Sequence, residues 1–316
     1  MSKTKFNKNI FYNEFKPDFL ILIKEFPDLK KYIIKQNEEK LEEISFDWSN
    51  NNLSLLMTKS ILDYYFNIKY YNIPKGYLIP PIPSRLNYLN LINKILIKEI
   101  NSQSRYSSDI IGIDIGTGAN IIYPILGNSI FNWKFICSEI NDESYNNAKL
   151  ILEKNNLENE INLIKQKNKN NIFLNILNQE NKYIFSLCNP PYYDYETEIK
   201  LDEKKRDNEF DFDEVYYQKG EFGFFQRYFI ESTCYKKKVY LFTILIGKKA
   251  NMENINDIMN TNDNKNIIKK FNIQKIQTGN NLRYIIYWSF FDNYTEFINT
   301  KLYSNEYNKF RPIIQY

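Results

Sequence analysis

The segment Asn189-Pro190-Pro191-Tyr192 carries the clearest chemical signal in the sequence. It follows the apolar run 183–188, which predicts a buried strand. The Asn189 side-chain oxygen and the Pro190 carbonyl can each accept one N–H of a ring amine, drawing its lone pair toward a methyl donor. The prolines fix that carbonyl rigidly, and Tyr192 can stack on a flat base. We predict that these four residues catalyse methyl transfer to a ring amine; the alternative is a proline-rich turn that ends a strand.

A glycine-containing turn at 114–118 predicts a cofactor pocket. It follows a predicted strand and opens a helix, where glycines let a ligand approach the backbone and the helix N-terminus offers amide donors. Glu139 ends the next predicted strand, where its carboxylate can accept both hydroxyls of a ribose. Ile121 replaces the third glycine of a dinucleotide-binding turn, which favours a nucleoside cofactor without phosphates. The predicted contacts are Asp114 (to a cationic methionine group), Gly116, Thr117, Gly118 and Glu139. The alternatives are a tight turn and a solvated carboxylate.

The composition excludes several classes of catalyst. The 316 residues include no histidine, which removes Ser-His-Asp and Cys-His catalysis, HExxH metalloproteases and Cys/His zinc fingers. The three cysteines lie far apart, so we predict neither a disulfide framework nor a metal site. The net charge of +4 permits nucleic-acid binding without arguing for it. We find no secretory signal and no membrane-spanning run, and therefore expect an intracellular protein, nuclear or cytoplasmic.

Strands that alternate with helices predict an α/β fold with a mostly parallel, doubly wound sheet. The predicted helices of this part are 141–154 and 224–235, and the predicted strands are 110–114, 133–139, 161–165, 183–188, 239–246, 273–277 and 283–290. The last two strands can close the sheet as an antiparallel hairpin around Gly279-Asn280. Together with the predicted methyl-transfer motif, this pattern leads us to expect a Rossmann-like fold similar to that of class I methyltransferases.

The first 83 residues predict a small helical extension. Residues 53–66 have apolar side chains at helical spacing. Residues 73–84 contain four prolines and should form an extended connector, after which Ser84 is a candidate N-cap for the next helix. We therefore divide the chain into an N-terminal helical extension with a basic arm at 1–83 and a methyltransferase domain at 84–316.

Further motifs surround these residues. They are Phe15-Lys-Pro-Asp-Phe19, Phe26-Pro-Asp-Leu29, Ile82-Pro-Ser-Arg-Leu-Asn-Tyr88, Asp114-Ile-Gly-Thr-Gly-Ala119, Tyr123-Pro124, Gly247-Lys-Lys249 and Trp288-Ser-Phe290. Together they resemble the methyltransferase-like protein 16 family from about Phe11 to Asp292. The segment 83–88 is specific to that family, whereas Asn-Pro-Pro-aromatic is shared by amino-methyltransferases in general. The resemblance implies an S-adenosylmethionine-dependent enzyme that makes N6-methyladenosine in structured RNA, either U6 small nuclear RNA or, in bacteria, large-subunit ribosomal RNA.

The resemblance also implies site residues. It places Arg85, Glu139, Asn189 and the loop from Gly116 to Asn120 against the cofactor, and the basic arm and the loop after Tyr192 against RNA. We predict RNA contacts by Lys5, Lys8, Tyr193, Lys248, Lys249 and Arg283. We also expect the chain to act as a monomer.

Three positions depart from the family pattern. Tyr192 stands in place of the usual phenylalanine, and both rings stack. The arm carries lysine and aromatic residues, including Lys8, Phe11 and Tyr12, where the family has arginines. The family segment Gln-Gly-Arg-Thr-x-Arg-Trp reads Thr278-Gly-Asn-Asn-Leu-Arg-Tyr284, which keeps the second arginine, Arg283.

Other interpretations stay open. The charged and aromatic segment 193–220 is either a lid or a solvated insertion, and Lys248-Lys249 either contacts phosphate or is ordinary charged surface. The alternative function is a protein glutamine-amide methyltransferase of release-factor type. A non-enzymatic alternative is a partner subunit that binds RNA.

Overall fold

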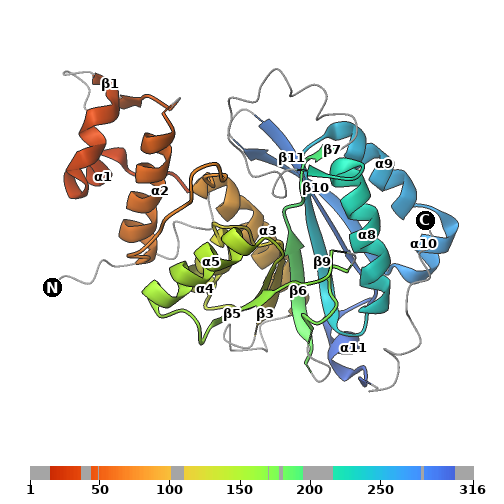
Figure 1. Cartoon of the computed structure of the whole chain (residues 1–316). Helices are drawn as coiled ribbons and strands as arrows, with labels where there is room; N and C mark the ends of the chain where they lie inside the picture. The colour runs from red at the N-terminus through yellow and green to blue at the C-terminus, as the bar shows by residue number, and fades with distance from the viewer. Residues whose placement is uncertain are drawn as a thin grey trace.

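A seven-stranded sheet forms the centre of the computed structural model, which describes residues 15–36, 44–48, 50–100, 110–169, 171–177, 181–194, 216–278 and 281–302. Its order is β10-β11-β9-β6-β3-β4-β5 (Figure 1). The strands are β3 (Ile111–Ile115), β4 (Lys134–Glu139), β5 (Ile161–Lys165), β6 (Tyr183–Cys188), β9 (Val239–Ile246), β10 (Lys270–Thr278) and β11 (Asn281–Ser289). The pairs from β5 to β9 are parallel, whereas β11 is antiparallel to β9 and β10. The predicted Rossmann-like sheet with its C-terminal hairpin is confirmed.

Helices cover both faces of this sheet (Figure 1). They are α3 (Ile82–Ile100), α4 (Ile122–Phe131), α5 (Asp142–Asn155), α8 (Gly220–Cys234), α9 (Lys249–Met259), α10 (Asn262–Ile267) and α11 (Tyr294–Asn299). Helix α4 connects β3 to β4, and α5 connects β4 to β5, toward one edge of the sheet. Helix α8 connects β6 to β9, toward the other edge. Right-handed crossovers in opposite directions place these helices on opposite faces. The order reverses between β3 and β6, which is where such sheets bind ligands.

The central strands are buried from end to end. Every residue of β6 and of β9 is buried, as expected for strands covered on both faces. Gly112 of β3 lets aromatic rings pack against the strand, because an added Cβ would lie 2.4 Å from Phe185 and 2.8 Å from Phe135. The continuous apolar runs of the sequence therefore give the sheet its core.

The residues before α3 form a separate layer (Figure 1). It consists of α1 (Phe19–Glu25), a 3-10 helix (Pro27–Tyr32), β1 (Ile33–Gln36), β2 (Ile44–Phe46) and α2 (Asn51–Phe66). The antiparallel pair β1-β2 was not predicted. Several hydrogen bonds join this layer to the sheet helices; among them, Ser129 Oγ donates to Phe66 O at 3.0 Å, and Lys69 N donates to Asn155 Oδ1 at 2.8 Å.

Two helix starts were predicted too late. Helix α3 begins at Ile82 rather than after Ser84, and Arg85 N donates to the Pro81 carbonyl at 3.3 Å. A proline in the first turn costs no hydrogen bond there, so Pro83 does not delay the helix. Helix α8 begins at Gly220 rather than at residue 224, after a backbone in the left-handed region at residue 219 (φ 61°). Neither start has the side-chain cap that marks a helix in sequence.

Several predictions fall outside the described residues. These are the arm with Lys5 and Lys8, residues 195–215 of the segment after the Asn-Pro-Pro-Tyr motif, and the turn at 279–280. Among the helices that the structure does describe, none combines the length and the apolar character that crossing a bilayer takes.

Candidate active site

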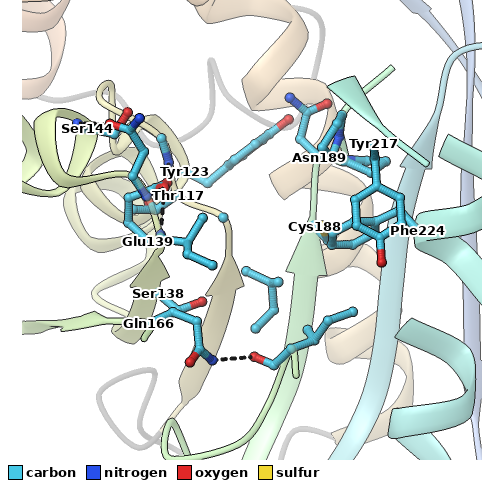
Figure 2. Close-up of a pocket in the computed structure, with 18 of the residues that line it drawn as sticks. Thr117, Tyr123, Ser138, Glu139, Ser144, Gln166, Cys188, Asn189, Tyr217 and Phe224 are labelled. Carbon is cyan, nitrogen blue, oxygen red and sulfur yellow. Dashed lines mark hydrogen bonds between the residues drawn. The ribbon is translucent and has the colours of Figure 1, made fainter. Parts of the chain in front are cut away.

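A cavity of about 250 Å³ opens where the parallel strands end at the reversal of the sheet. One part, called here the nucleoside half, is lined by Gly116, Thr117, Gly118, Asn120, Ser138 and Glu139. The opposite part, called here the acceptor half, is lined by Asn189, Pro190, Pro191, Tyr192, Tyr217, Phe224 and Arg227. Figure 2 shows Thr117 and Glu139 on one side, facing Asn189 and Phe224 on the other. The two sequence motifs thus line one cavity.

The glycine turn holds the nucleoside half open. Gly116 (φ 66°) and Gly118 (φ 67°) both occupy the left-handed region, and a Cβ on Gly116 would meet no described atom within 4 Å. Thr117 N donates to the Ser138 carbonyl at 2.9 Å, which ties the turn to β4. Ile121 also holds a positive φ of 43°, unusual for a β-branched residue. The turn keeps a glycine-like path there although the third glycine is missing.

Glu139 lies at the end of β4 with most of its acceptor capacity already used. Its Oε1 accepts from Ile140 N at 2.7 Å and Asn141 N at 2.8 Å, and its Oε2 accepts from Gly118 N at 2.8 Å. Burial raises the pKa of Glu139, and these three N–H groups oppose that rise. Each carboxylate oxygen has two lone pairs, so Oε2 can accept one further donor from the cavity.

Asp114 is buried beneath the turn and does not line the cavity that we describe. The Thr117 hydroxyl donates to its Oδ2 at 2.7 Å, and no described atom bonds its Oδ1. Burial raises the pKa of Asp114 to about 7, nearby Glu139 adds to the rise, and Thr117 and Arg85 oppose it. The contact of Asp114 with a methionine group stays a prediction, whereas its hydrogen bond from the Thr117 hydroxyl is observed.

Arg85 reaches the cavity from the first turn of α3. Its Nη1 donates to the Tyr123 hydroxyl at 3.0 Å, and its guanidinium lies 5.4 Å from the centre of that ring. Burial raises the pKa of Tyr192, and the nearby positive charge of Arg85 opposes that rise. The buried Nε of Arg85 has no partner among the described residues. A buried donor of this kind costs stability unless a ligand bonds it, so this wall of the cavity is suited to an anionic group.

Asn189 and Tyr192 are bonded to each other. The Tyr192 hydroxyl donates to Asn189 Oδ1. The Tyr192 ring is covered by Arg283, whose guanidinium lies 5.6 Å from the ring centre and donates to the Gly247 carbonyl at 3.2 Å. A Cβ on Gly247 would lie 3.2 Å from Tyr192 Cδ1, so the glycine lets the ring approach closely.

The predicted RNA contacts that the structure describes surround the acceptor half. Tyr193 is 42% exposed, and Lys248 Nζ lies 5.6 Å from the centre of its ring. Lys249 is exposed and pairs with Glu253 at 3.3 Å. Arg283 is occupied by Gly247 and the Tyr192 ring. These side chains therefore gather at one end of the sheet, and their contact with RNA stays a prediction.

Sequence reasoning did not assign to the site several residues that line the cavity, among them Tyr123, Tyr217, Phe224 and Arg227. Tyr123 bonds Arg85, and the rings of Tyr217 and Phe224 meet edge to face at 5.3 Å between centres. Aromatic residues are too frequent in this chain, at 16%, for single rings to stand out. No group of three or more metal-ligating side chains occurs in the described parts of the chain.

Comparison with known proteins identifies related sequences. The sequence model of a family described as RNA methyltransferase matches residues 2–292. The ribosomal RNA large subunit methyltransferase F of Flavobacterium johnsoniae is 36% identical over 293 residues, which cover 87% of this chain and 90% of that protein. The Pseudomonas entomophila protein of the same name is 28% identical over 87% of this chain and 90% of its own length.

Solved structures share the fold over nearly the whole chain. The hMettl16 catalytic domain in complex with MAT2A 3'UTR hairpin 1 has a TM-score of 0.74 and 28% identity, covering 92% of this chain and 96% of that one. The N-terminal domain of human METTL16 in complex with SAH has a TM-score of 0.70 and 26% identity, covering 92% and 99%.

The buried Asp114 predicts a pH-dependent loss of stability in the cofactor-free chain. Its pKa is raised from 3.8 to about 7, so between these values the folded chain binds a proton that the unfolded chain has released. The resulting loss of folding stability is absent below pH 3.8 and complete above about pH 7. Between about pH 5 and about pH 8, the free energy of unfolding should therefore fall by at least about 1 kcal/mol more in wild type than in Asp114→Asn.

Urea unfolding at the two pH values measures this difference. Asp257→Asn, which removes the charge of an exposed aspartate on α9, is the matched control and should follow wild type. Parallel pH profiles for wild type and Asp114→Asn would contradict the expected cost.

Proposed function

The chain belongs to the RNA methyltransferase family whose sequence model spans residues 2–292, and from this premise we propose its reaction. It transfers a methyl group from S-adenosylmethionine to the exocyclic N6 amine of an unpaired adenine in a structured RNA, and acts as a monomer. The observation that carries the proposal is the joining of the nucleoside half and the acceptor half in one cavity at the reversal of the sheet.

The nucleoside half has the groups that an S-adenosyl cofactor requires. The remaining lone pair of Glu139 Oε2 suits a ribose hydroxyl, and the buried Nε of Arg85 suits the carboxylate of the methionine part. The open backbone at Gly116 leaves space for the cofactor beside the turn. When bound, S-adenosylmethionine supplies a methyl group on a positively charged sulfur. The human METTL16 domain that contains SAH has the same fold, which supports this assignment.

The acceptor half can hold a flat base with an exocyclic amine. Asn189 Oδ1 and the Pro190 carbonyl accept its two N–H groups, and Tyr192 offers a ring for stacking. Stacking of a base on an aromatic side chain contributes about 1 to 3 kcal/mol. Catalysis then consists mainly of positioning, which agrees with a chain that has no histidine.

An adenine within a duplex cannot enter this half. The Watson–Crick edge of a paired base is occupied, and its faces are stacked, so the base must first be splayed out of the helix. Relatives named for large-subunit ribosomal RNA make that RNA the first substrate class to test. RNA hairpins come second, because the hMettl16 domain of the same fold is in complex with one, and the sequence resemblance adds U6-like RNA to this class.

Asn189→Ala should lower the rate of methyl transfer by about a hundredfold, because the amine loses an acceptor that orients it. Single-turnover methylation of RNA measures the rate, and circular dichroism checks that the variant folds. A variant that retained more than about a tenth of the wild-type rate would remove Asn189 from this role.

Glu139→Gln should weaken binding of S-adenosylmethionine by about 1.5 to 3 kcal/mol, because the ribose hydroxyl loses a charged acceptor. Calorimetry with S-adenosylhomocysteine measures this change without turnover. Glu160→Gln, at an exposed carboxylate before β5, is the control. Equal affinity of Glu139→Gln and wild type would exclude Glu139 from ribose binding.

The substrate class is tested by a competition among three acceptors. They are an RNA hairpin with a looped adenine, the same RNA fully paired, and a peptide with a release-factor-type glutamine. We expect methylation of the looped RNA alone. Equal turnover of looped and paired RNA would refute the need for splaying, and methylation of the peptide alone would establish the glutamine-amide alternative.

A further inference from the structure

The Tyr192 hydroxyl is a feature that the family resemblance does not supply, because the family has phenylalanine at this position. In this chain the hydroxyl lies between Arg85 of the first helical turn of α3 and Asn189 at the end of β6. It donates to Asn189 Oδ1, and the positive charge of Arg85 acts on the same phenol. The hydroxyl thus contacts the residue suited to the acceptor amine and lies near a residue suited to the cofactor.

The direction of this hydrogen bond agrees with the chemistry of the groups. A positive charge attracts the phenol oxygen and repels its proton, so nearby Arg85 favours a hydroxyl whose proton points away from it. The acceptor of that proton is Asn189 Oδ1. If the Asn189 amide were flipped, its NH₂ group would face the hydroxyl and the buried phenol proton would lose its partner. Because amide orientation is decided by the surrounding network, Arg85 and Tyr192 together fix which end of Asn189 carries the oxygen.

The ring cannot easily move away from this position. Arg283 covers it at 5.6 Å, and the Gly247 backbone lies against its edge. Burial raises the pKa of Tyr192, so the phenol keeps its proton at neutral pH and remains a donor. The oxygen of Asn189 has a second lone pair, which is left for an amine N–H.

We propose that Tyr192 is a positioning residue, whose hydroxyl fixes the Asn189 amide with its oxygen ready for the acceptor amine before the base enters. This rests on the proposed function, in which Asn189 accepts an N–H of the target adenine. Phenylalanine, the usual residue of the family at this position, has no hydroxyl and cannot make this hydrogen bond.

The first test separates binding of the amine from chemistry. RNA with adenine at the target position is compared with the same RNA carrying purine, which lacks the 6-amino group, in the presence of S-adenosylhomocysteine. In wild type the amine should strengthen RNA binding about fivefold, the effect of one hydrogen bond. In Tyr192→Phe this preference should largely disappear, while binding of the purine RNA and of S-adenosylhomocysteine stays unchanged.

The second test measures turnover. Tyr192→Phe should lower kcat about tenfold, as is typical when an orienting partner of a site residue is removed, with little change in KM for RNA. In an Asn189→Ala background the same substitution should have no further effect, because the hydroxyl acts through Asn189. A merely structural role would give additive losses instead.

Tyr240→Phe is the matched control. It also removes a hydroxyl from a buried tyrosine with a charged partner, since Tyr240 donates to Glu99 Oε2 at 2.9 Å, but at the opposite end of the sheet. It should preserve both the preference for adenine and kcat. A Tyr192→Phe variant with the wild-type preference and kcat would overturn the inference alone. Wild type that binds adenine and purine RNA equally would instead overturn the assignment of Asn189 to the amine, and the inference with it.

Discussion

The site depends on the register between two parallel strands. Ile115 of β3 lies opposite Cys188 of β6, so the turn after β3 and the segment after β6 leave the sheet at the same level. The chain leaves these strands in opposite directions, through α4 after β3 and through α8 after β6, which is the arrangement that opens a ligand site between two strands. A slip of one residue would exchange the side chains of β6 between the two packed faces of the sheet, so the packing of the core also fixes the distance between the two halves of the cavity.

The sequence predicts the strands better than the helix starts for a physical reason. Strands β5, β6 and β9 were predicted with their observed bounds because they are apolar runs that end at polar residues. The start of α3 is decided by a backbone bond from Arg85 N to Pro81 O, and that of α8 by the left-handed backbone at Lys219. Neither leaves a capping side chain to read, and both helices were predicted to begin too late.

The site shows the same division between what a motif specifies and what packing adds. Glu139 and Asn189 follow strands, so their position at the cavity could be inferred from spacing. The contact of Asp114 with a methionine group stays a prediction, whereas its bond from the Thr117 hydroxyl is a contact that spacing did not indicate. Tyr217 and Phe224 come from segments with no motif, and with 26 Tyr and 23 Phe in the chain their ring types carry no signal.

Helix α8 explains how those unpredicted residues are held. Near its start, the buried Glu221 accepts from Gly247 N at 2.6 Å and Lys248 N at 3.2 Å, which fixes the loop after β9. Nearly three turns later, the buried Glu231 accepts from Ile172 N at 2.8 Å, which fixes the segment after β5. A buried carboxylate is costly unless such donors surround it, so both loops must close for the helix to pack. Helix α8 therefore fixes two loops beside the cavity, the one after β9 and the one after β5. The first of these contains Gly247, which lies against the Tyr192 ring.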